Sequence, residues 1–322
     1  MGSIPSSFEI DLLPLRLRFR MHGVFGLAEF PGSLIRGVLG RALKDLVCVA
    51  EHRDCVRCVL RAGCPYPSLI EPVRPEGIDV FAGERTIPPP YVLSWDRAGR
   101  VLREGDVWTV GVTLIGPAAR LAGHVVAALS RGAQRGFGPE QVRASLDRVE
   151  AQAPEGWVVL DPGRLPERAR GVPFRRLAGG AGAWGGEVAL AFRTPARITS
   201  GGKLRENPTG AEVLRARLRR VGALAAFYGR GAHEAEARHL SRQAEGLEAS
   251  WQDRRWVEVS RYSGRQRTRM KFGGVVGVLR LKGDLGPWAP WLSAGCRVHV
   301  GKNASFGLGR YELGDANGAG GN

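Results

Sequence analysis

The stretch "LRLRFR", Leu15–Arg20, alternates apolar and basic residues without interruption. A period of two is typical of a strand with one face against a core and the other face open. Arg16, Arg18 and Arg20 would then share the open face. The alternation is compatible with a solvated basic stripe and with the wall of a ligand groove, and both interpretations stay open.

A helix is predicted directly after this strand, in "FPGSLIRGVLGRALKDLVC", residues 30–48. Pro31 suits a first helical turn, and the apolar residues that follow recur at helical spacing. They are Leu34, Ile35, Val38, Leu39, Ala42 and Leu43. Arg36, Arg41 and Lys44 lie outside this apolar set, so they can face outward or into a cleft.

The next segments continue a recognisable order. An extended segment is predicted in "TIPPPYVLSW", residues 86–95, and a strand in "DVWTVGVTLIG", residues 106–116. "PAARLAGHVVAALSR", residues 117–131, reads as a helix, and residues 135–151 return to extended chain. Strand, helix, two strands, helix and strand is the order of a ferredoxin-like unit.

The second half of the chain repeats this pattern. "WGGEVALAFRTPARITSGG", residues 184–202, restarts with a strand, and helical composition follows over residues 210–251 with a break near "YGRG". Strand signals over residues 255–285, a short helix from Pro287, and the glycine-rich "VGKNASFGLGRYEL", residues 300–313, complete it.

The predicted fold class is therefore α+β, with two tandem ferredoxin-like domains. The first domain covers 1–160 and carries a cysteine-containing insertion. A linker rich in Pro, Gly and Arg covers 161–186. The second domain covers 187–322, with a basic helical insertion at about 209–250 and a glycine-rich loop near its end.

The charge balance indicates a polyanionic partner. Lys and Arg number 47 against 31 Asp and Glu, which gives a net charge of +16. Such a field accelerates the capture of polyanions, and arginine offers forked donors that suit phosphate and base edges. Half of the excess, 16 − 8 = +8, lies in residues 203–271. A nucleic acid is the favoured ligand.

Four of the five cysteines, Cys48, Cys55, Cys58 and Cys64, lie within 17 residues. Cys55-x-x-Cys58 has the spacing of a zinc knuckle. The gaps on either side are wider than in common zinc ribbons, so the spacing allows structural zinc but favours reduced structural cysteines. The odd number of cysteines argues against a disulfide framework.

The remaining sequence signals exclude several classes. No apolar run approaches the length of a membrane span, and the N-terminus lacks a secretion signal, so we expect a cytoplasmic protein. There is no G-x-S-x-G elbow, no H-E-x-x-H and no G-x-x-x-x-G-K-[ST] loop. These absences leave hydrolase triads, zincin sites and P-loops without support.

An ordered set of segments resembles the CRISPR pre-crRNA-processing endoribonucleases of the repeat-associated RAMP superfamily. The matching pieces are "IRGVLGRALKDLVC", "CVLRAGCPYPSLIEP", "IPPPYVLS", "AFRTPARI", "RYSGRQRTRMKFGGVVGVLRL" and "AGCRVHVGKNASFGLGRYEL". The resemblance implies two RAMP (RRM-like) ferredoxin folds and a groove for CRISPR repeat RNA. It also implies cleavage without a metal, by attack of a ribose 2′-hydroxyl, giving a 2′,3′-cyclic phosphate and a 5′-hydroxyl.

One departure from the family pattern concerns the first helix. Many relatives carry a histidine where this chain has Arg41, in "RGVLGRAL". Arginine stays protonated, so it can stabilise charge on a phosphate but is a poor general base. His22 is the nearest histidine and can act as the base. The hypothesis is that Arg20, His22, Arg36 and Arg41 converge near the scissile phosphate. Variants from type IV systems would be compatible with such an arginine-based site.

Other residues are expected to hold the RNA. Arg16 and Arg18 are candidates on the first strand, and Lys302 with the amides around Gly301, Gly307 and Gly309 would meet flanking phosphates. The remaining candidates are Arg215, Arg219, Arg238 and Arg242 on the helical pair, and Arg261, Tyr262, Arg265 and Arg267 after it. Processed crRNA and other CRISPR effector subunits are the expected partners.

Two alternatives remain. The first is a RAMP subunit that binds crRNA in an effector complex without cutting it, which the missing helix histidine favours. The second is a DNA-binding or scaffold protein built on a zinc site at the four cysteines. The second explains the charge but neither the glycine-rich stretch nor the tandem pattern.

Overall fold

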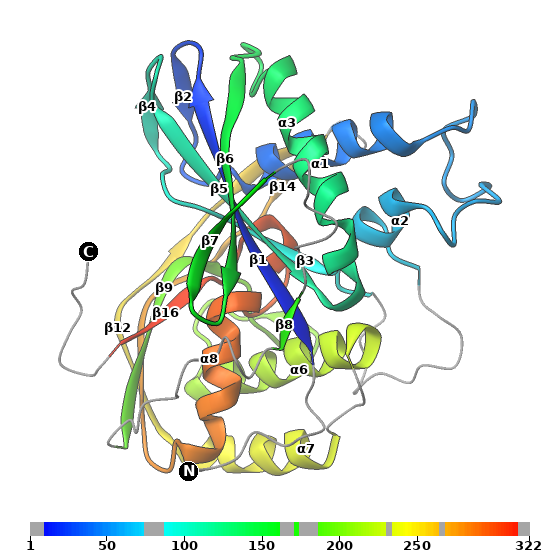
Figure 1. The fold of residues 1–322 in the computed structure, drawn as a ribbon. Helices are drawn as coiled ribbons and strands as arrows, with labels where there is room; N and C mark the ends of the chain where they lie inside the picture. The colour runs from blue at the N-terminus through cyan, green and yellow to red at the C-terminus, as the bar shows by residue number, and fades with distance from the viewer. Residues whose placement is uncertain are drawn as a thin grey trace. The chain divides into compact units, whose positions relative to one another are not determined.

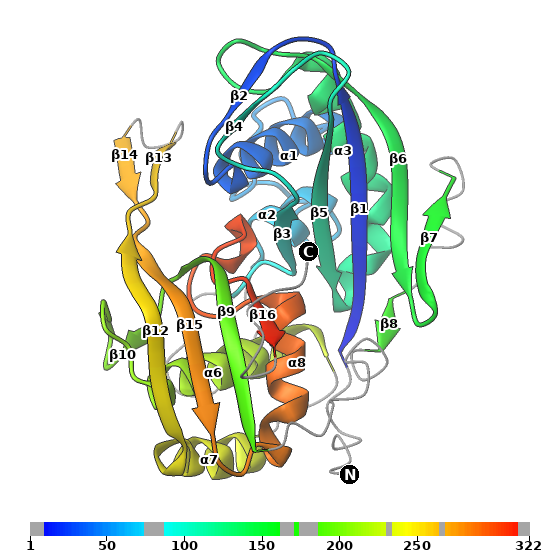
Figure 2. The same cartoon turned by 90° about the vertical axis from the view of Figure 1, so that its left-hand side faces the viewer.

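The computed structural model describes residues 10–73, 87–161, 171–173, 186–229, 234–263 and 268–314. These residues fall into two compact units, the first within 10–173 and the second within 186–314. Figures 1 and 2 show the elements of each unit.

The first unit has a mixed α/β sequence of elements. Its strands are β1 (Asp11–Met21), β2 (Phe25–Leu27), β3 (Tyr91–Trp95), β4 (Arg100–Leu102), β5 (Val107–Ile115), β6 (Ala144–Ala153), β7 (Gly156–Leu160) and β8 (Val172–Pro173). Its helices are α1 (Gly32–Val47), α2 (Pro65–Ile70) and α3 (Ala122–Arg135), with a 3₁₀ turn over Gly116–Leu121.

The main sheet of this unit is antiparallel, in the order β3-β5-β1-β6-β7. Leu15 of β1 stands opposite Val112 on one side and Ala151 on the other. Leu15, Leu17 and Phe19 are buried in one core with side chains of α1 and α3. Figure 2 shows the two helices on one face of the sheet. The predicted strand and first helix are thus confirmed.

The second unit repeats the arrangement. Its strands are β9 (Glu187–Ala196), β10 (Thr199–Ser200), β11 (Lys203–Leu204), β12 (Glu248–Val257), β13 (Ser260–Ser263), β14 (Thr268–Lys271), β15 (Gly274–Lys282) and β16 (Tyr311–Gly314). Its helices are α6 (Gly210–Tyr228), α7 (Glu234–Gln243) and α8 (Ala289–Val298), with 3₁₀ turns over Ala244–Gly246, Gly286–Trp288 and Ala304–Phe306.

Its sheet has the order β12-β15-β9-β16, all antiparallel. In the first unit β1 lies between β5 and β6, and in the second unit β9 lies between β15 and β16. This placement of the first strand, in the middle of the sheet, is the ferredoxin-like topology. The structure therefore has the predicted fold class, two ferredoxin-like units with helices inserted in the second.

The structure changes two details of the predicted elements. The basic helical insertion ends before position 250, because Glu248–Val257 pair with β15 and form the sheet edge. Pairing with a neighbouring strand outweighs local helical composition there. Within the segment predicted as a linker, Val172 and Pro173 form β8 and pair with β1.

Among the helices of the described residues, none is both long and apolar enough to cross a lipid bilayer.

Helix α6 begins at a capping box, in which the side chains of Thr209 and Glu212 each accept a hydrogen bond from the other residue's backbone amide. This cap fixes the start of the longest helix of the second unit.

Candidate functional site

The three arginines of β1 share one open face of the first sheet, as predicted, and each has a partner from β6 or β7. The Arg16 guanidinium stacks over the Trp157 ring, 3.8 Å from its centroid. Arg18 lies 3.4 Å from the Glu150 carboxylate. Because Glu150 is buried and also attracts Arg148, the arginines of this face have internal partners and do not form a bare cationic stripe.

A polar group stands where β1 ends. The His22 Nε2 atom lies 3.0 Å from Ser145 Oγ on β6, and His22 is exposed. Arg20 donates to Asp147 at 3.2 Å and to the carbonyl of Gly105 at 3.3 Å. An imidazole, a hydroxyl and a guanidinium thus lie near one another at the exposed end of β1, a combination that can move a proton and neutralise an oxyanion.

The structure does not bring Arg36 to this group. Arg36 lies beside the buried Tyr91 of β3, and burial raises the pKa of that phenol while Arg36 opposes the rise. Tyr91 is level with Leu13 of β1 through the pairing with β5, seven residues before Arg20. Seven strand residues span about 23 Å, so the predicted convergence of Arg20 with Arg36 does not occur.

Arg41 is exposed on α1. In the described part of the chain, its side chain has no hydrogen-bond or ion-pair partner, and no recorded contact joins it to His22 or Arg20. Its guanidinium is therefore available to an external anion. The nearby carboxylate of Asp45 is already held by Arg53 and Arg135, which keeps the pKa of Asp45 below its usual value.

The arginines of α6 hold the second unit together. Arg215 bonds the Ser241 carbonyl and Glu245, and Arg219 bonds the Thr199 carbonyl at 2.6 Å. Arg220 donates to the Val298 carbonyl at the end of α8. Of the four arginines predicted to grip RNA from the helical pair, Arg238 and Arg242 on α7 are exposed.

The remaining predicted contacts lie in or next to β13 and β14. Arg261 and Tyr262 are in β13, opposite Met270 and Arg269 of β14. Arg265 and Arg267 lie outside the described residues.

The glycine-rich loop joins α8 to β16 and folds tightly against the end of β9. The Lys302 amide donates to the Arg197 carbonyl at 3.0 Å, and the Gly309 amide to the Pro195 carbonyl at 2.9 Å. Buried Thr194 donates to the Gly307 carbonyl at 2.7 Å. These bonds fix the loop without using any lysine or arginine side chain of the loop.

Glycine is required at specific loop positions. The backbone at Gly301, Gly307 and Gly309 has φ of 79°, 85° and 70°, where side chains are strained. A Cβ at Gly309 would also lie 1.9 Å from the Val300 carbonyl oxygen. Lys302 is exposed at the tip. The loop is therefore a preformed tight turn that presents one cation to solvent.

Two buried polar residues support this loop, and the sequence analysis did not single them out. Arg217 is fully buried and donates to the Trp291 carbonyl at 2.8 Å and to the His299 carbonyl at 3.5 Å. His299 ends α8 with φ 59°, and burial, assisted by Arg310, lowers its pKa to about 3. Arg217 lies between Leu214 and Val221 on the apolar side of α6, so helical spacing could have revealed its burial.

The four clustered cysteines are free and half-buried. They lie between α1 and α2, and all four line one small pocket. In the residues that the structure describes, no three or more His, Cys, Asp or Glu side chains are placed to hold a metal ion.

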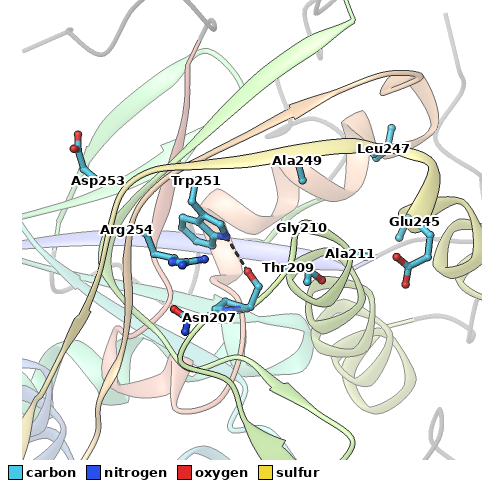
Figure 3. Close-up of a pocket in the computed structure, with 12 residues that line it drawn as sticks. Asn207, Thr209, Gly210, Ala211, Glu245, Leu247, Ala249, Trp251, Asp253 and Arg254 are labelled. Atoms are coloured by element: carbon cyan, nitrogen blue, oxygen red, sulfur yellow. Dashed lines mark hydrogen bonds between the residues drawn. The ribbon is translucent and has the colours of Figure 1, made fainter.

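A second, larger pocket of about 720 Å³ lies in the second unit, between the start of α6 and strand β12. Figure 3 shows the Arg254 guanidinium and the Asn207 amide on the same side as the Trp251 ring, while Asp253 points away. The Trp251 Nε1 atom donates to the Pro208 carbonyl at 2.8 Å. An aromatic ring, a guanidinium and an amide on one pocket suit a planar polar ligand.

Two family models cover most of the chain. One, described as an N-terminal domain (AF_1859_N), matches residues 10–170. The other, CRISPR-associated endoribonuclease Cas6, matches residues 190–311, which include the glycine-rich loop. The second unit therefore resembles the Cas6 family of CRISPR-associated endoribonucleases. A comparison with curated protein sequences gives no match.

Solved Cas6 structures share the fold. The Thermus thermophilus Cas6 matches 97% of this chain and 100% of its own, with 14% identity and a TM-score of 0.55. Its product complex gives 16% identity and a TM-score of 0.56 over 94% of this chain and 99% of its own. A partial Cas6-RT-Cas1–Cas2 complex gives 16% identity and a TM-score of 0.61, over 97% of this chain and 47% of its own.

Proposed function

We propose that this protein binds CRISPR repeat RNA and cuts it once per repeat, releasing crRNA from its precursor. The main observation behind this proposal is the match of residues 190–311 to the Cas6 family. These residues include the tight glycine turn and the exposed Lys302. The net charge of +16 supports a polyanionic substrate. Processed crRNA and other CRISPR subunits are the proposed partners, and a similar fold occurs within a Cas6-RT-Cas1–Cas2 complex.

The proposed chemistry is transesterification without a metal. The ribose 2′-oxygen forms a bond to the adjacent phosphorus while the bond from phosphorus to the 5′-oxygen breaks. The proton of the 2′-hydroxyl passes to a base, and the leaving 5′-oxygen takes up a proton. The ends are a 2′,3′-cyclic phosphate and a 5′-hydroxyl, with no water consumed.

We assign the proton transfer to His22 and the neutralisation of charge to Arg20 and Arg41. His22 is exposed at 3.0 Å from Ser145, which orients its ring, and Arg20 lies two residues away. Arg41 has no partner among the described residues and can bind phosphate. Arg36, beside Tyr91, is proposed to hold α1 against β3 and not to touch the RNA.

The RNA body is proposed to lie on exposed cations of the second unit. Lys302 would contact a phosphate, and Arg238 and Arg242 would contact the repeat stem. The pocket at Trp251 has the volume and the groups to hold an unpaired nucleotide, with Arg254 against its phosphate. Arg16, Arg18, Arg215 and Arg219 would act indirectly, since the structure already gives each an internal partner.

The test uses end-labelled cognate repeat RNA in buffer without Mg²⁺ and with EDTA. We expect a single cut that leaves a 2′,3′-cyclic phosphate, identified by its conversion with acid and phosphatase. His22→Ala and Arg41→Ala should each lower the single-turnover rate at least 10²-fold. His239→Ala, another exposed histidine but on α7, is the matched control and should cut normally. Near-normal cutting by both site variants would overturn the residue assignment.

A non-cleaving crRNA-binding subunit is the second candidate, because Arg41 stands where many relatives have a histidine. Tight binding of repeat RNA by the wild-type protein with no cut, with or without Mg²⁺, would establish this alternative. A cut that requires Mg²⁺ would contradict the proposed chemistry while leaving RNA processing intact.

A further inference from the structure

The segment between α1 and α2, residues 48–64, is 17 residues long and contains no helix or strand. Loops of that length without secondary structure are uncommon in compact domains and usually have a dedicated function or cross-link. This segment holds four of the chain's five cysteines. The cysteines therefore fall where the backbone lacks other regular support.

The apolar side chains of the segment point outward. Val59 is 96% exposed, and Val49, Val56 and Leu60 are also exposed. The segment is held by short backbone turns, by the ion pair of Arg53 with Asp45 of α1, and by local side-chain hydrogen bonds of Cys48, His52 and Asp54. A segment that buries so little apolar surface needs another source of stability, and in small modules this is commonly a disulfide or a structural metal.

The four cysteines line one pocket. Cys48, Cys55, Cys58 and Cys64 are each half-buried there. The pocket has room for about 30 Å³, which is the share of one water-sized occupant. Cys48 directly follows α1, and Cys64 directly precedes α2. An ion in this pocket would tie the ends of both helices together.

The pocket also supplies positive charge. Four thiolates around Zn²⁺ carry a net charge of −2, which neighbouring cations must balance. Lys44, Arg53 and Arg61 line the same pocket. The Arg61 Nε atom is buried and has no hydrogen-bond partner among the described residues. A thiolate sulfur is an acceptor that would satisfy this donor.

We propose that Cys48, Cys55, Cys58 and Cys64 together bind one zinc ion as a structural site. Four S–H bonds break and four Zn–S bonds form, the four protons pass to solvent, and no oxidant is needed. As placed in the structure, the thiols are not at ligand distances, so binding rotates them inward to about 2.3 Å from the ion. The site is structural and independent of the RNA chemistry proposed above.

The test begins with the wild-type full-length protein, purified with a thiol reductant. We expect about one zinc per chain by mass spectrometry of the metal. After chelation and Co²⁺ addition, we expect the intense near-ultraviolet sulfur-to-cobalt bands and the tetrahedral visible bands of a four-thiolate site. Chelation should also lower Tm and free four thiols to a thiol reagent.

Cysteine variants locate the site. Cys58→Ser should lose most of the zinc, while Cys296→Ser, the fifth cysteine in α8, should keep it. If Cys58→Ser fails to fold, the cobalt spectrum of the wild type still decides. Zinc below about 0.1 per chain without cobalt–thiolate bands would overturn the proposal. Disulfides detected in the wild type, or equal metal loss in Cys296→Ser, would overturn it as well.

Discussion

At the scale of single residues, the stability of the second unit depends on polar side chains that are buried in its core, such as Arg217 and His299. The Arg217 guanidinium donates hydrogen bonds to a backbone carbonyl of α8 and to the hydroxyl of Tyr311. Burial lowers the pKa of Arg217 because the charged form loses hydration, and the hydrogen bonds offset part of that loss. Such a residue is structural even though it belongs to a basic helix.

Arg217→Met should therefore destabilise the protein by about 2–3 kcal/mol, because the Trp291 carbonyl would stay buried without its donor. Urea unfolding of the full-length chain measures this free energy. Arg242→Met, an exposed arginine on α7, is the matched control and should shift it by less than about 0.5 kcal/mol. Equal effects of the two substitutions would contradict the structural role.

His299 makes the stability of the protein depend on pH. Its pKa is lowered to about 3 in the folded protein, so between about pH 6.5 and 3 only the unfolded chain takes up its proton. This contribution to stability is complete above pH 6.5 and is lost as the pH falls, by up to about 1.4 kcal/mol per pH unit. His299→Asn, which removes the titrating imidazole, should flatten the fall in stability between pH 7 and 5. A parallel pH profile for the two proteins would refute this.

At the scale of elements, the turn that joins α8 to β16 is set by backbone geometry. Its amides bond the carbonyls of Pro195 and Arg197 at the end of β9, and its glycines permit the positive φ angles that this route requires. The loop is thus held in place before any ligand arrives, which lowers the ordering cost of binding an RNA strand.

Gly309→Ala should destabilise the protein by about 2 kcal/mol or more, through strain at φ 70° and overlap with the Val300 carbonyl. Thermal unfolding provides the measurement. Gly222→Ala in the interior of α6, where an added Cβ meets no atom within 4 Å, should instead stabilise it, by about 0.5–1 kcal/mol. Loss of stability in both variants would mean that backbone conformation is not the cause.

Asp45 links α1 to α3 and to the segment that follows α1, because it pairs with Arg135 at the end of α3 and with Arg53. Its hydrogen bonds to Arg135 and Arg53 lower its pKa below 3.8. Its contribution to stability is therefore present above about pH 4 and disappears as the pH falls through the lowered pKa. Asp45→Asn should lower Tm slightly at pH 7, and this difference in Tm should shrink as the pH falls through the lowered pKa. A difference in Tm that persists unchanged at acid pH would exclude this ionic link.

At the scale of the whole molecule, a net charge of +16 predicts strong salt dependence of RNA binding. For a double helix, the slope of log K against log salt is about −0.9 for each phosphate neutralised. Because Arg238 and Arg242 are proposed to contact the repeat stem, Arg238→Gln with Arg242→Gln should make this slope shallower by about 1.8. The paired Arg193 and Arg215 provide the control double variant, which should keep the slope. An unchanged slope in the α7 variant would remove α7 from the RNA surface but leave the proposed cleavage untouched.

Particular residues show which features of the structure could be predicted from the sequence. The alternation at Leu15–Arg20 predicted β1 and the shared face of its arginines, and helical spacing predicted α1 from Pro31 onward. Spacing could not show that Glu150 and Trp157, more than 130 residues later, would meet those arginines. Nor could it show that Arg36 on α1 lies beside Tyr91, at the other end of the sheet from Arg20.

The sequence by itself determined the tandem ferredoxin-like pattern and the net charge of +16, because periodicity, the order of the motifs and charge are properties of the chain. Tertiary structure alone decided which cations are free. Helical spacing places Arg217 on the apolar side of α6, but only the fold shows that Arg215 and Arg219 also bond other elements while Arg41 stays open to solvent. The physical reason is that availability depends on burial and partners, which arise from contacts between residues far apart in the chain.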